Sequence, residues 1–397
     1  MQIMTVKDVD LKGKRVLVRE DLNVPRDKKT RELTDDTRIR AAVPTIKYLI
    51  EQETKVIIMS HLGRPKGEIK EELRLDKVGA RLSEYLNQPV TVATDCIGES
   101  AKAAVAAMKP GDVVLLENVR FYPEEEKNDD NFSKELAKFG DIFVNDAFGT
   151  AHRAHCSTCG VGHFLPTVAG FLMDNEIKAL SHVLNQSESP FVAIIGGAKV
   201  SDKIGVIENL LNKVDSIIIG GGMANTFLAA KGCQMGTSLM ESDKLAIAQD
   251  LMNQAQAKGK KMLLPVDLVI AQDMEHPETA ENVDIYAVPA DKMALDIGEK
   301  TRELYINELK TAHSIFWNGP MGVFEVPEFA KGTFEIAQAI AATDANSVIG
   351  GGDSVAAVQK AGLWDQITHI STGGGASLEY LEGKTLPGIA VIQMKAE

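Results

Sequence analysis

The chain has 397 residues, a formal net charge of −13 at pH 7 and 44% hydrophobic residues. This length predicts two domains at ~100–200 residues each, and the ordinary apolar content lets each domain bury a core. The negative charge argues against nucleic acid and anionic lipid as partners, because like charges repel.

The composition also bears on the compartment. No apolar run approaches the ~18 residues of a membrane span. The first residues, MQIMTVKDVDLKGK, lack the apolar region of a signal peptide, and four cysteines are too few for a disulfide framework. We therefore expect no membrane association and a cytoplasmic location with free thiols.

Apolar runs of strand length alternate with longer segments of helical periodicity along the chain. In the first half they lie at 15–21, 55–61, 90–93, 113–118 and 141–146, and in the second half at 191–197, 216–222, 261–267, 313–319, 346–352 and 369–374. Continuous Val, Ile and Leu runs indicate strands buried on both faces, as in parallel sheets covered by helices. The pattern predicts an α/β fold with two doubly wound, Rossmann-like parallel-sheet domains.

A helical segment at 171–186 separates the two sets of strands. Its apolar residues recur at helical spacing, and Pro190 precedes the next strand. It fits a hinge helix between domains, and an ordinary surface helix of one domain fits the pattern equally well. We expect an N-terminal domain over 1–170, an interdomain helix over 171–188 and a C-terminal domain over 189–380. The last apolar stretch, which follows a Pro-Gly break, is expected to pack back on an earlier part of the chain.

Basic and polar residues follow the strands of the first half. They are Arg19, Asp21, Asn23, Arg38, His61, Arg64, Arg120, His152, Arg153 and His155. A single arginine at a strand end is commonly a surface ion pair. Several arginines at successive strand ends meet at one edge of a sheet, where their mutual repulsion calls for an anion. The sequence therefore predicts a site for a small ligand with more than one acidic group.

Glycine follows the strands of the second half instead. GGAK (196–199), GGGMA (220–224), GGGDS (350–354) and GGGAS (373–377) each end a strand and are expected to open a helix. Glycine lets the backbone approach phosphate closely, and a helix N-terminus offers free N–H groups. Four such loops favour a nucleotide, although neither the P-loop pattern nor the dinucleotide fingerprint is present.

Charged residues at these loops support the same interpretation. Lys199 and Lys203 are expected on one face of a helix near its positive end, where a phosphate would relieve their repulsion. Asp353 is either a helix N-cap or a ligand of a nucleotide-bound Mg²⁺. Glu325 is either a surface carboxylate or an acceptor for ribose hydroxyls.

The segment HRAHCSTC (152–159) has the spacing of metal or redox ligands. Structural zinc motifs usually pair two separated ligand clusters, however, and a thioredoxin-like C-x-x-C opens a helix in a much smaller fold. We expect no metal here, and whether Cys156 and Cys159 have a role stays open.

These motifs, taken together, resemble the phosphoglycerate kinase family. The resemblance rests on REDLNVP, TRIRAAVPTIKYL, SHLGRP, LLENVRF, NDAFGTAHRAH, GGAKVSDKI, IIGGGMANTF, LPVD, WNGPMGVFE, GGGDS and STGGGASLE, spread from residue 19 to 379. Departures are small: Ser354 stands where many members have Thr, Glu20 stands where many have a small or apolar residue, and the loop 26–33 lacks a common glycine.

The resemblance implies a glycolytic kinase that moves a phosphoryl group reversibly between ATP and the carboxylate of 3-phosphoglycerate. The implied 3-phosphoglycerate contacts are Asp21, Asn23, Arg38, His61, Arg64, Arg120 and Arg153. The implied nucleotide contacts are Lys199, Lys203, Gly221, Asn318, Glu325, Gly351, Gly352, Asp353, Ser354, Gly373 and Gly374. Asp353 is tied to the Mg²⁺ that accompanies ATP or ADP. A monomer that bends at a hinge is also implied, as is a C-terminal tail, at about 381–397, that returns to the N-terminal domain.

The carboxylate nucleophile is ionised at pH 7, so no general base is expected. Arg38, Lys199 and Lys203 are the expected catalytic residues, since they could offset charge on the transferring group. The alternative is a non-catalytic, two-lobed anion-binding protein, which would leave the glycine loops and the paired lysines without a purpose.

Overall fold

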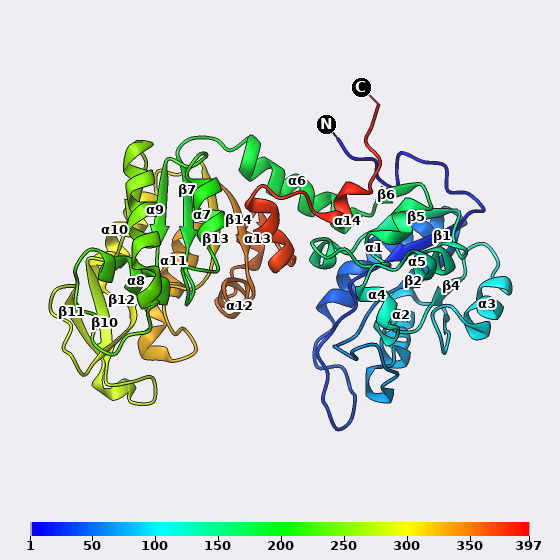
Figure 1. Cartoon of the computed structure of the whole chain (residues 1–397), viewed down its shortest axis with the longest axis horizontal. Coiled ribbons are helices and arrows are strands. Elements are labelled where there is room, and N and C mark those ends of the chain that lie inside the picture. Colours follow the sequence, from blue (N-terminus) through cyan, green and yellow to red (C-terminus); the bar gives the residue numbers. More distant parts are fainter. Residues whose placement is uncertain (1, 397) are drawn as a thin grey trace. The chain divides into compact units, whose positions relative to one another are not determined.

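The computed structural model describes residues 2–396. The chain divides into two compact units, one that runs to Lys178 and resumes at Thr385, and one that spans Ala179–Lys384. Helix α6 (Phe171–Asn185) carries the chain from the first unit into the second (Figure 1).

The first unit is built on a six-stranded parallel sheet in the order β3-β4-β2-β1-β5-β6. The strands are β1 (Arg15–Arg19), β2 (Lys55–Met59), β3 (Val90–Val92), β4 (Val113–Leu115), β5 (Ile142–Asn145) and β6 (Thr167–Ala169). Five of them were predicted. β6 was missed because its sequence, Thr-Val-Ala, contains no run of Val, Ile or Leu.

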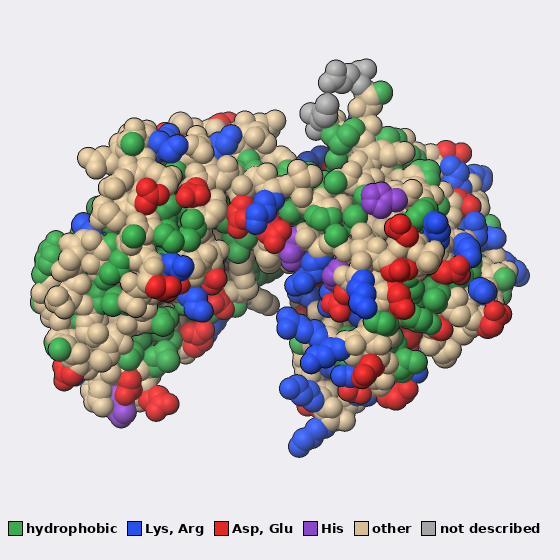
Figure 2. All heavy atoms as spheres, in the orientation of Figure 1, with side chains coloured by type: hydrophobic (Ala, Val, Ile, Leu, Met, Phe, Trp, Pro, Cys, Tyr) green, Lys and Arg blue, Asp and Glu red, His purple; other side chains and the backbone are tan. Residues whose placement is uncertain are grey.

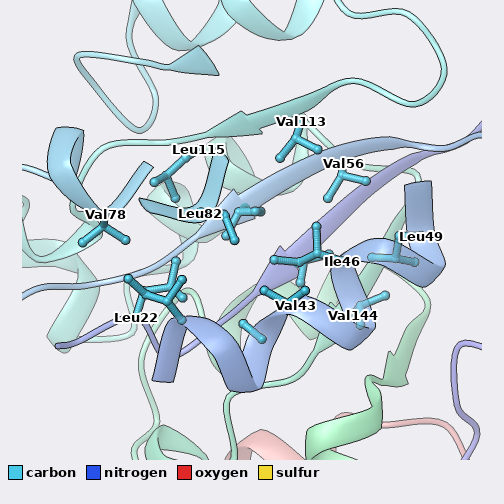
Figure 3. Close-up of a cluster of buried hydrophobic side chains, with 14 of the residues drawn as sticks. Leu22, Val43, Ile46, Leu49, Val56, Val78, Leu82, Val113, Leu115 and Val144 are labelled. Atoms are coloured by element: carbon cyan, nitrogen blue, oxygen red, sulfur yellow. The ribbon is translucent and has the colours of Figure 1, made fainter. Parts of the chain in front are cut away.

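Helices cover both faces of this sheet, because successive strand residues point to opposite sides. Val16 and Val18 of β1 pack in the cluster of Figure 3 with Ile46 of α1 and Leu82 of α2. Leu17, between them, packs in a second cluster on the other face. The helices are α1 (Thr37–Glu51) and α2 (Asp76–Leu86) on the first face, and α3 (Glu99–Ala106) and α5 (Asp130–Ala137) on the second.

Helix α6 begins on a buried carboxylate. Asp146, just after β5, accepts from the backbone N–H of Leu172 at 3.0 Å and of Met173 at 3.3 Å. A Cβ at Gly170 would lie 2.1 Å from Asp146 Oδ1, so only glycine lets the chain turn into the helix this closely. The sheet of the first unit therefore fixes where α6 starts.

The end of the chain packs on the first unit. Short helix α14 (Pro387–Ala390) lies in this segment, and Asn145 Nδ2 donates to Gly388 O at 2.8 Å. Met394 forms an antiparallel bridge with Ile3, and Thr5 forms a parallel bridge with Ala169. Both ends of the described chain thus contact the β5–β6 edge of the sheet.

The second unit contains another six-stranded parallel sheet, in the order β15-β14-β13-β7-β8-β9. Its strands are β7 (Phe191–Ile195), β8 (Ser216–Ile219), β9 (Lys261–Leu263), β13 (Ser314–Asn318), β14 (Asn346–Gly350) and β15 (His369–Ile370). Ile194, Trp317 and Ile349 pack with Tyr305 and Ile336 in one core cluster. The helices are α7 (Ile204–Leu210), α8 (Gly222–Ala230), α9 (Leu245–Ala257), α10 (Glu299–Leu309), α11 (Lys331–Ala341), α12 (Gly352–Lys360) and α13 (Gly375–Leu381).

A small antiparallel sheet lies at one end of the second unit (Figure 1). It comprises β10 (Asp267–Ala271), β11 (Glu281–Asp284) and β12 (Met293–Ile297). The sequence analysis missed this sheet and treated 261–267 as one strand. That segment divides at Pro265, which cannot donate to a strand ladder, so β9 ends in one sheet and β10 begins in another.

The predicted α/β class with two doubly wound parallel sheets is confirmed. Within the described chain, no helix combines the length and apolar character that a membrane crossing needs.

Glu20 faces Asp146 in the core of the first unit, where each residue is 1% exposed. Burial, and next to it the neighbouring Asp146, raises the pKa of Glu20 well above its usual value, and burial raises the pKa of Asp146 to about 6. Two neighbouring carboxyl groups in a buried site do not both ionise readily, because their charges repel. Glu20, whose pKa is raised well above its usual value, is the group that holds the proton, and Asp146 remains the acceptor for α6.

This pair makes stability fall as the pH rises. Consider a carboxyl group whose pKa in the folded state exceeds its value of ~4.3 in the unfolded state. Its full contribution to the stability of the fold is present below pH ~4.3, and this contribution is lost as the pH rises through the folded-state pKa. We predict that Glu20→Gln, which keeps the shape and a donor, flattens the decline in the free energy of unfolding between about pH 5 and 8 by about 1 kcal/mol or more. Urea unfolding at several pH values measures this, with exposed Glu51→Gln as the control. Equal slopes in wild type and Glu20→Gln would contradict it.

Candidate active site

Polar residues gather where the parallel strands of the first unit end. In Figure 2, Lys and Arg side chains are grouped along one edge of this unit. β1 leads into Asp21 and Asn23, β2 into His61, and β4 into the short turn Val119–Phe121 that contains Arg120. The carboxyl ends of parallel strands meet at one edge of a sheet, which is where open α/β folds bind ligands.

Hydrogen bonds connect most of these predicted residues. Arg38 Nη1 donates to Asn23 O at 2.6 Å and lies 3.5 Å from Asp21 Oδ1. Asn23 Oδ1 accepts from Gly63 N at 2.9 Å, and Arg120 Nη1 donates to Gly63 O at 3.3 Å. Three loops that are distant in sequence are thereby held together.

The positive groups crowd one another. Burial and the charges of Arg19, Arg120 and Arg38 hold the pKa of His61 well below its usual value. Burial and the same kind of neighbours lower the pKa of His155 to about 4. Burial also lowers the pKa of Arg120, and the nearby charge of Arg153 adds to that effect. The edge of the sheet therefore carries a concentrated positive potential in a protein of net negative charge.

Two predicted arginines differ from the rest. Arg153 is exposed, and its positive charge helps to lower the pKa values of Arg120 and His155. Arg64 is also exposed, and the hydrogen-bonded set above does not include it. Arg19, which the sequence placed at a strand end without a site role, is fully buried beneath His61 and donates to its Nδ1 at 2.9 Å.

Glycines with left-handed backbone form the corresponding edge of the second unit. Gly197, Gly221, Gly319, Gly351 and Gly374 have φ between 54° and 111°. A Cβ at Gly319 would lie 2.2 Å from Gly196 O, so the loops after β7 and β13 can approach this closely only as glycine. Helices α8, α12 and α13 open at three of the predicted glycine loops.

The expected placement of Lys199 and Lys203 on one helix face is wrong. α7 begins only at Ile204, and Lys203 is its N-cap residue with φ −121°. Gly197 turns the chain away from the strand with φ 111°, and residues 201–203 form a turn before the helix can start. Lys199 lies exposed on this loop, and its charge helps to lower the pKa of Glu241.

Lys203 extends back over the sheet. Its Nζ donates to Asn318 Oδ1 at the end of β13. Burial lowers the pKa of Lys203 to about 8, although the charges of Asp202 and Asp353 oppose the shift. Asn318 itself is 1% exposed, and its Nδ2 has no hydrogen-bond partner among the described residues. The side chains of Lys203 and Asn318 are thus held together at the strand ends that carry the glycine loops.

Ser354 has a structural contact at the same place. It is fully buried in the first turn of α12, and its Oγ accepts from Gly319 N at 2.6 Å. Asp353 and Gly352, its neighbours, are exposed at the start of the helix. Gly373 N donates to Ser371 Oγ at 3.3 Å, and Gly374, with φ 54°, precedes α13.

A cavity of about 580 Å³ opens beside these loops. Gly221, Glu325 and Asp353 line it, as do apolar side chains from the small sheet and its connections. Leu239, Met274, Met293, Leu295 and Met321 are among the latter, and the sequence analysis did not find them. They occur singly over more than eighty positions with no shared spacing, so no local pattern could have revealed them.

The HRAHCSTC segment packs into the first unit. Cys156 Sγ donates to Glu124 O and Asp129 O, both at 3.3 Å, and burial raises the pKa of this thiol to about 12. Cys159 Sγ lies 3.9 Å from His163 Nε2. Across residues 2–396, no three His, Cys, Asp or Glu side chains form a group that could hold a metal ion.

The chain is a phosphotransferase built from two units. Clustered arginines lie at the edge of one parallel sheet, and glycine turns, a cavity and the half-buried Lys203 lie at the edge of the other. The chain belongs to the phosphoglycerate kinase family, since the model of that family, described as "Phosphoglycerate kinase", matches residues 6–384.

Individual relatives agree with this family. The chain is 57% identical to phosphoglycerate kinase of Moorella thermoacetica over 395 residues, with 100% of both chains covered. It is 56% identical to that of Dictyoglomus turgidum, with 99% of each covered. The solved structure of phosphoglycerate kinase from Coxiella burnetii matches with a TM-score of 0.90 at 43% identity, and that from Pyrococcus horikoshii with 0.84 at 36%, each with 98% of both chains covered.

The resemblance noted from the sequence motifs is therefore confirmed, and the chain is an enzyme, a glycolytic phosphotransferase. The alternative of a non-catalytic anion-binding protein is not favoured.

Two neighbouring glycines allow a matched test of the strand-end geometry. Gly351 has φ 90°, and a Cβ there would lie 3.0 Å from Asn318 Nδ2, whereas Gly352 has nothing within 4 Å of the Cβ position. We predict that Gly351→Ala lowers the free energy of unfolding by roughly 1–3 kcal/mol through backbone strain. Gly352→Ala should leave it unchanged or slightly higher, because alanine favours a helix. Denaturant unfolding of the two variants measures this, and equal losses would contradict it.

Proposed function

We propose that the arginine-lined edge of the first unit binds 3-phosphoglycerate and that the cavity and glycine loops of the second unit bind ATP or ADP. The protein then transfers a phosphoryl group between ATP and the carboxylate of 3-phosphoglycerate, giving ADP and 1,3-bisphosphoglycerate reversibly.

The observation that carries this proposal is the crowding of positive groups at the strand-end edge of the first unit. Arg38, Arg120 and Arg153 lie near His61 and His155, whose pKa values are lowered by these charges. Asp21, 3.5 Å from Arg38, supplies one carboxylate to this group. A ligand with a phosphate and a carboxylate supplies the missing negative charge, and arginine suits both groups because it can donate two parallel hydrogen bonds.

Three features of the second unit support nucleotide binding. Its cavity of about 580 Å³ has an apolar lining suited to a base, while Glu325 lines the same cavity and could accept from ribose hydroxyls. The N-termini of α8 and α12 offer backbone N–H groups for phosphate. Burial lowers the pKa of Lys203 to about 8, and a neighbouring phosphate would raise it again and favour the charged form.

Asp353 is the residue that would hold Mg²⁺ with the nucleotide. It is exposed in the first turn of α12, lines the cavity and lies near Lys203. A single carboxylate fits Mg²⁺, which usually takes one or two protein carboxylates and keeps phosphate and water as its other ligands. When bound, the ion would offset charge on the phosphate oxygens.

The protein's own residues then have three tasks. They bind the acceptor so that its carboxylate, ionised at neutral pH, needs no general base. They orient the donor phosphates against the glycine loops. Arg38, Lys199 and Lys203 stabilise negative charge on the transferring group, which in-line transfer spreads over its oxygens. Because transfer requires donor and acceptor to meet, we propose that bending at α6 lets the bound substrates approach each other and exclude water.

Charge and family also support the remaining expectations. A net charge of −13 opposes binding to nucleic acid, and a monomer in the cytoplasm suits a glycolytic kinase that acts on small, dissolved substrates.

Arg38 and Arg40 provide a matched test, since both lie in the first turn of α1. Arg40 is paired with Asp36 at 3.1 Å, outside the proposed site. We predict that Arg38→Ala lowers kcat for ATP-dependent phosphorylation of 3-phosphoglycerate by roughly 10²–10³-fold, the usual effect of removing one donor to developing charge. Arg40→Ala should keep near-normal activity. The assay couples product formation to NADH oxidation.

Two results would count against this function. Full activity in Arg38→Ala would remove its assigned role, and absence of turnover in folded wild type supplied with Mg²⁺ would argue against the reaction itself.

A further inference from the structure

Arg19 is a buried arginine that the proposed reaction does not use. It is the last residue of β1 and is 0% exposed. Its Nε donates to Ser157 Oγ at 2.8 Å, its Nη1 donates to Glu20 O, and its Nη2 donates to His61 Nδ1 at 2.9 Å. All three guanidinium nitrogens are therefore engaged inside the protein.

Glu125 anchors the other end of this chain of contacts. Its carboxylate, also 0% exposed, accepts from Ser157 Oγ at 2.6 Å and from Ser157 N at 3.0 and 3.2 Å. Burial raises the pKa of Glu125, while the charge of Arg19 and the Ser157 donors oppose that shift. A carboxylate balancing a buried guanidinium is the arrangement in which two such charges are tolerated together.

The direction of each hydrogen bond follows from these end groups. A guanidinium can only donate, and an ionised carboxylate can only accept. The Ser157 hydroxyl therefore accepts from Arg19 and donates to Glu125. At the other end, His61 Nδ1 must accept from Arg19 with its lone pair, which leaves Nε2 as the nitrogen that carries the ring proton.

The charged surroundings of His61 favour the same neutral form. The groups that act on its ring are Arg19, Arg120, Arg38 and His155, and each opposes a second proton. His61 is 3% exposed, so burial disfavours the imidazolium further.

We propose that Arg19, held by Ser157 and Glu125, is a positioning residue that fixes His61 as a neutral donor, through Nε2–H, to an oxygen of the bound phosphoglycerate. This rests on the proposed function, in which His61 contacts that substrate. Arg19 acts through His61 and does not touch the ligand. The arginines of the site then supply the positive charge that attracts the ligand. His61 supplies one hydrogen bond whose strength does not change with pH.

A purely structural role for Arg19 would leave the His61 tautomer and the pH profile unconstrained. These are therefore the properties to measure. In full-length enzyme with ¹⁵N-labelled histidine, long-range ¹H–¹⁵N spectra report which ring nitrogen is protonated. We expect His61 with a bare Nδ1 and a protonated Nε2, unchanged from about pH 5 to 8, the range in which a free histidine titrates. A protonated Nδ1, or titration within this range, would overturn the proposal.

A double variant tests the dependence on Arg19. Arg19→Met with Glu125→Gln removes both buried charges together, a change that folded proteins often tolerate. We expect the ring proton of His61 to redistribute between Nδ1 and Nε2, because Nδ1 no longer receives a hydrogen bond, and the KM for 3-phosphoglycerate to rise roughly tenfold or more, while the KM for ATP is unchanged. A normal KM for 3-phosphoglycerate with the proton still confined to Nε2 would contradict the proposal. Ser216→Ala, at a buried serine of the second unit, is the control.

Two substitutions at His61 provide a second route should the double variant not fold. The amide nitrogen of glutamine can occupy the place of Nε2, whereas that of asparagine reaches only the place of Nδ1. His61→Gln should therefore keep a KM for 3-phosphoglycerate near that of wild type, and His61→Asn should raise it roughly tenfold. Equal effects would count against an Nε2 donor.

The tests separate this inference from the proposed function. The expected tautomer with no response of the His61 signals to 3-phosphoglycerate would support the buried chain and refute the substrate contact. If the His61 signals respond to 3-phosphoglycerate but Nδ1 carries the proton, the substrate contact is supported and the role of Arg19 is refuted.

Discussion

Positive charge concentrated at the carboxyl ends of the first unit's strands is the constraint on which the rest of that unit depends. Parallel strands bring Asp21, His61 and Arg120 to one edge, and the same geometry buries Arg19 beneath them. Buried guanidinium is tolerated because Glu125 balances it through Ser157. Asp21 lies 3.5 Å from Arg38, and the charges of Glu126 and Glu125 act on Arg120. The basic groups nevertheless lower the pKa values of His61 and His155, so an acidic substrate would relieve their crowding.

The second unit meets the opposite problem, because it must bring backbone close to phosphate. Left-handed glycines after β8 and β13 let loops approach one another within distances that a Cβ would prevent. Ser354 Oγ accepts from the backbone N–H of Gly319 in one of these loops, and Asn318 Oδ1 accepts from Lys203 Nζ. Lys203 is desolvated in this position. Left-handed glycines and a desolvated lysine are thus concentrated where the proposed nucleotide phosphates would lie.

Elements with a local, repeated sequence pattern could be predicted from the sequence. Features that form only when distant segments pack together could not. Continuous apolar strands and glycine-ended turns are local signals, and they located both parallel sheets. The small antiparallel sheet was missed because β11 is mostly exposed and the start of β10 was merged with β9 into one predicted strand. The Lys199–Lys203 helix face was wrong because a turn delays α7. The cavity's scattered methionines and leucines, and the link from Glu125 to Arg19, become visible only when distant segments come together.

The central claim is that each unit holds one substrate, and hydrogen–deuterium exchange with single ligands tests it most directly. With 3-phosphoglycerate alone, we expect slower exchange at residues 19–23, 61–64, 118–122 and 150–158. With ATP and Mg²⁺ alone, we expect it at 196–203, 220–225, 318–325 and 350–354. Protection of second-unit segments by 3-phosphoglycerate, with none at the arginine-lined edge of the first unit, would contradict the account.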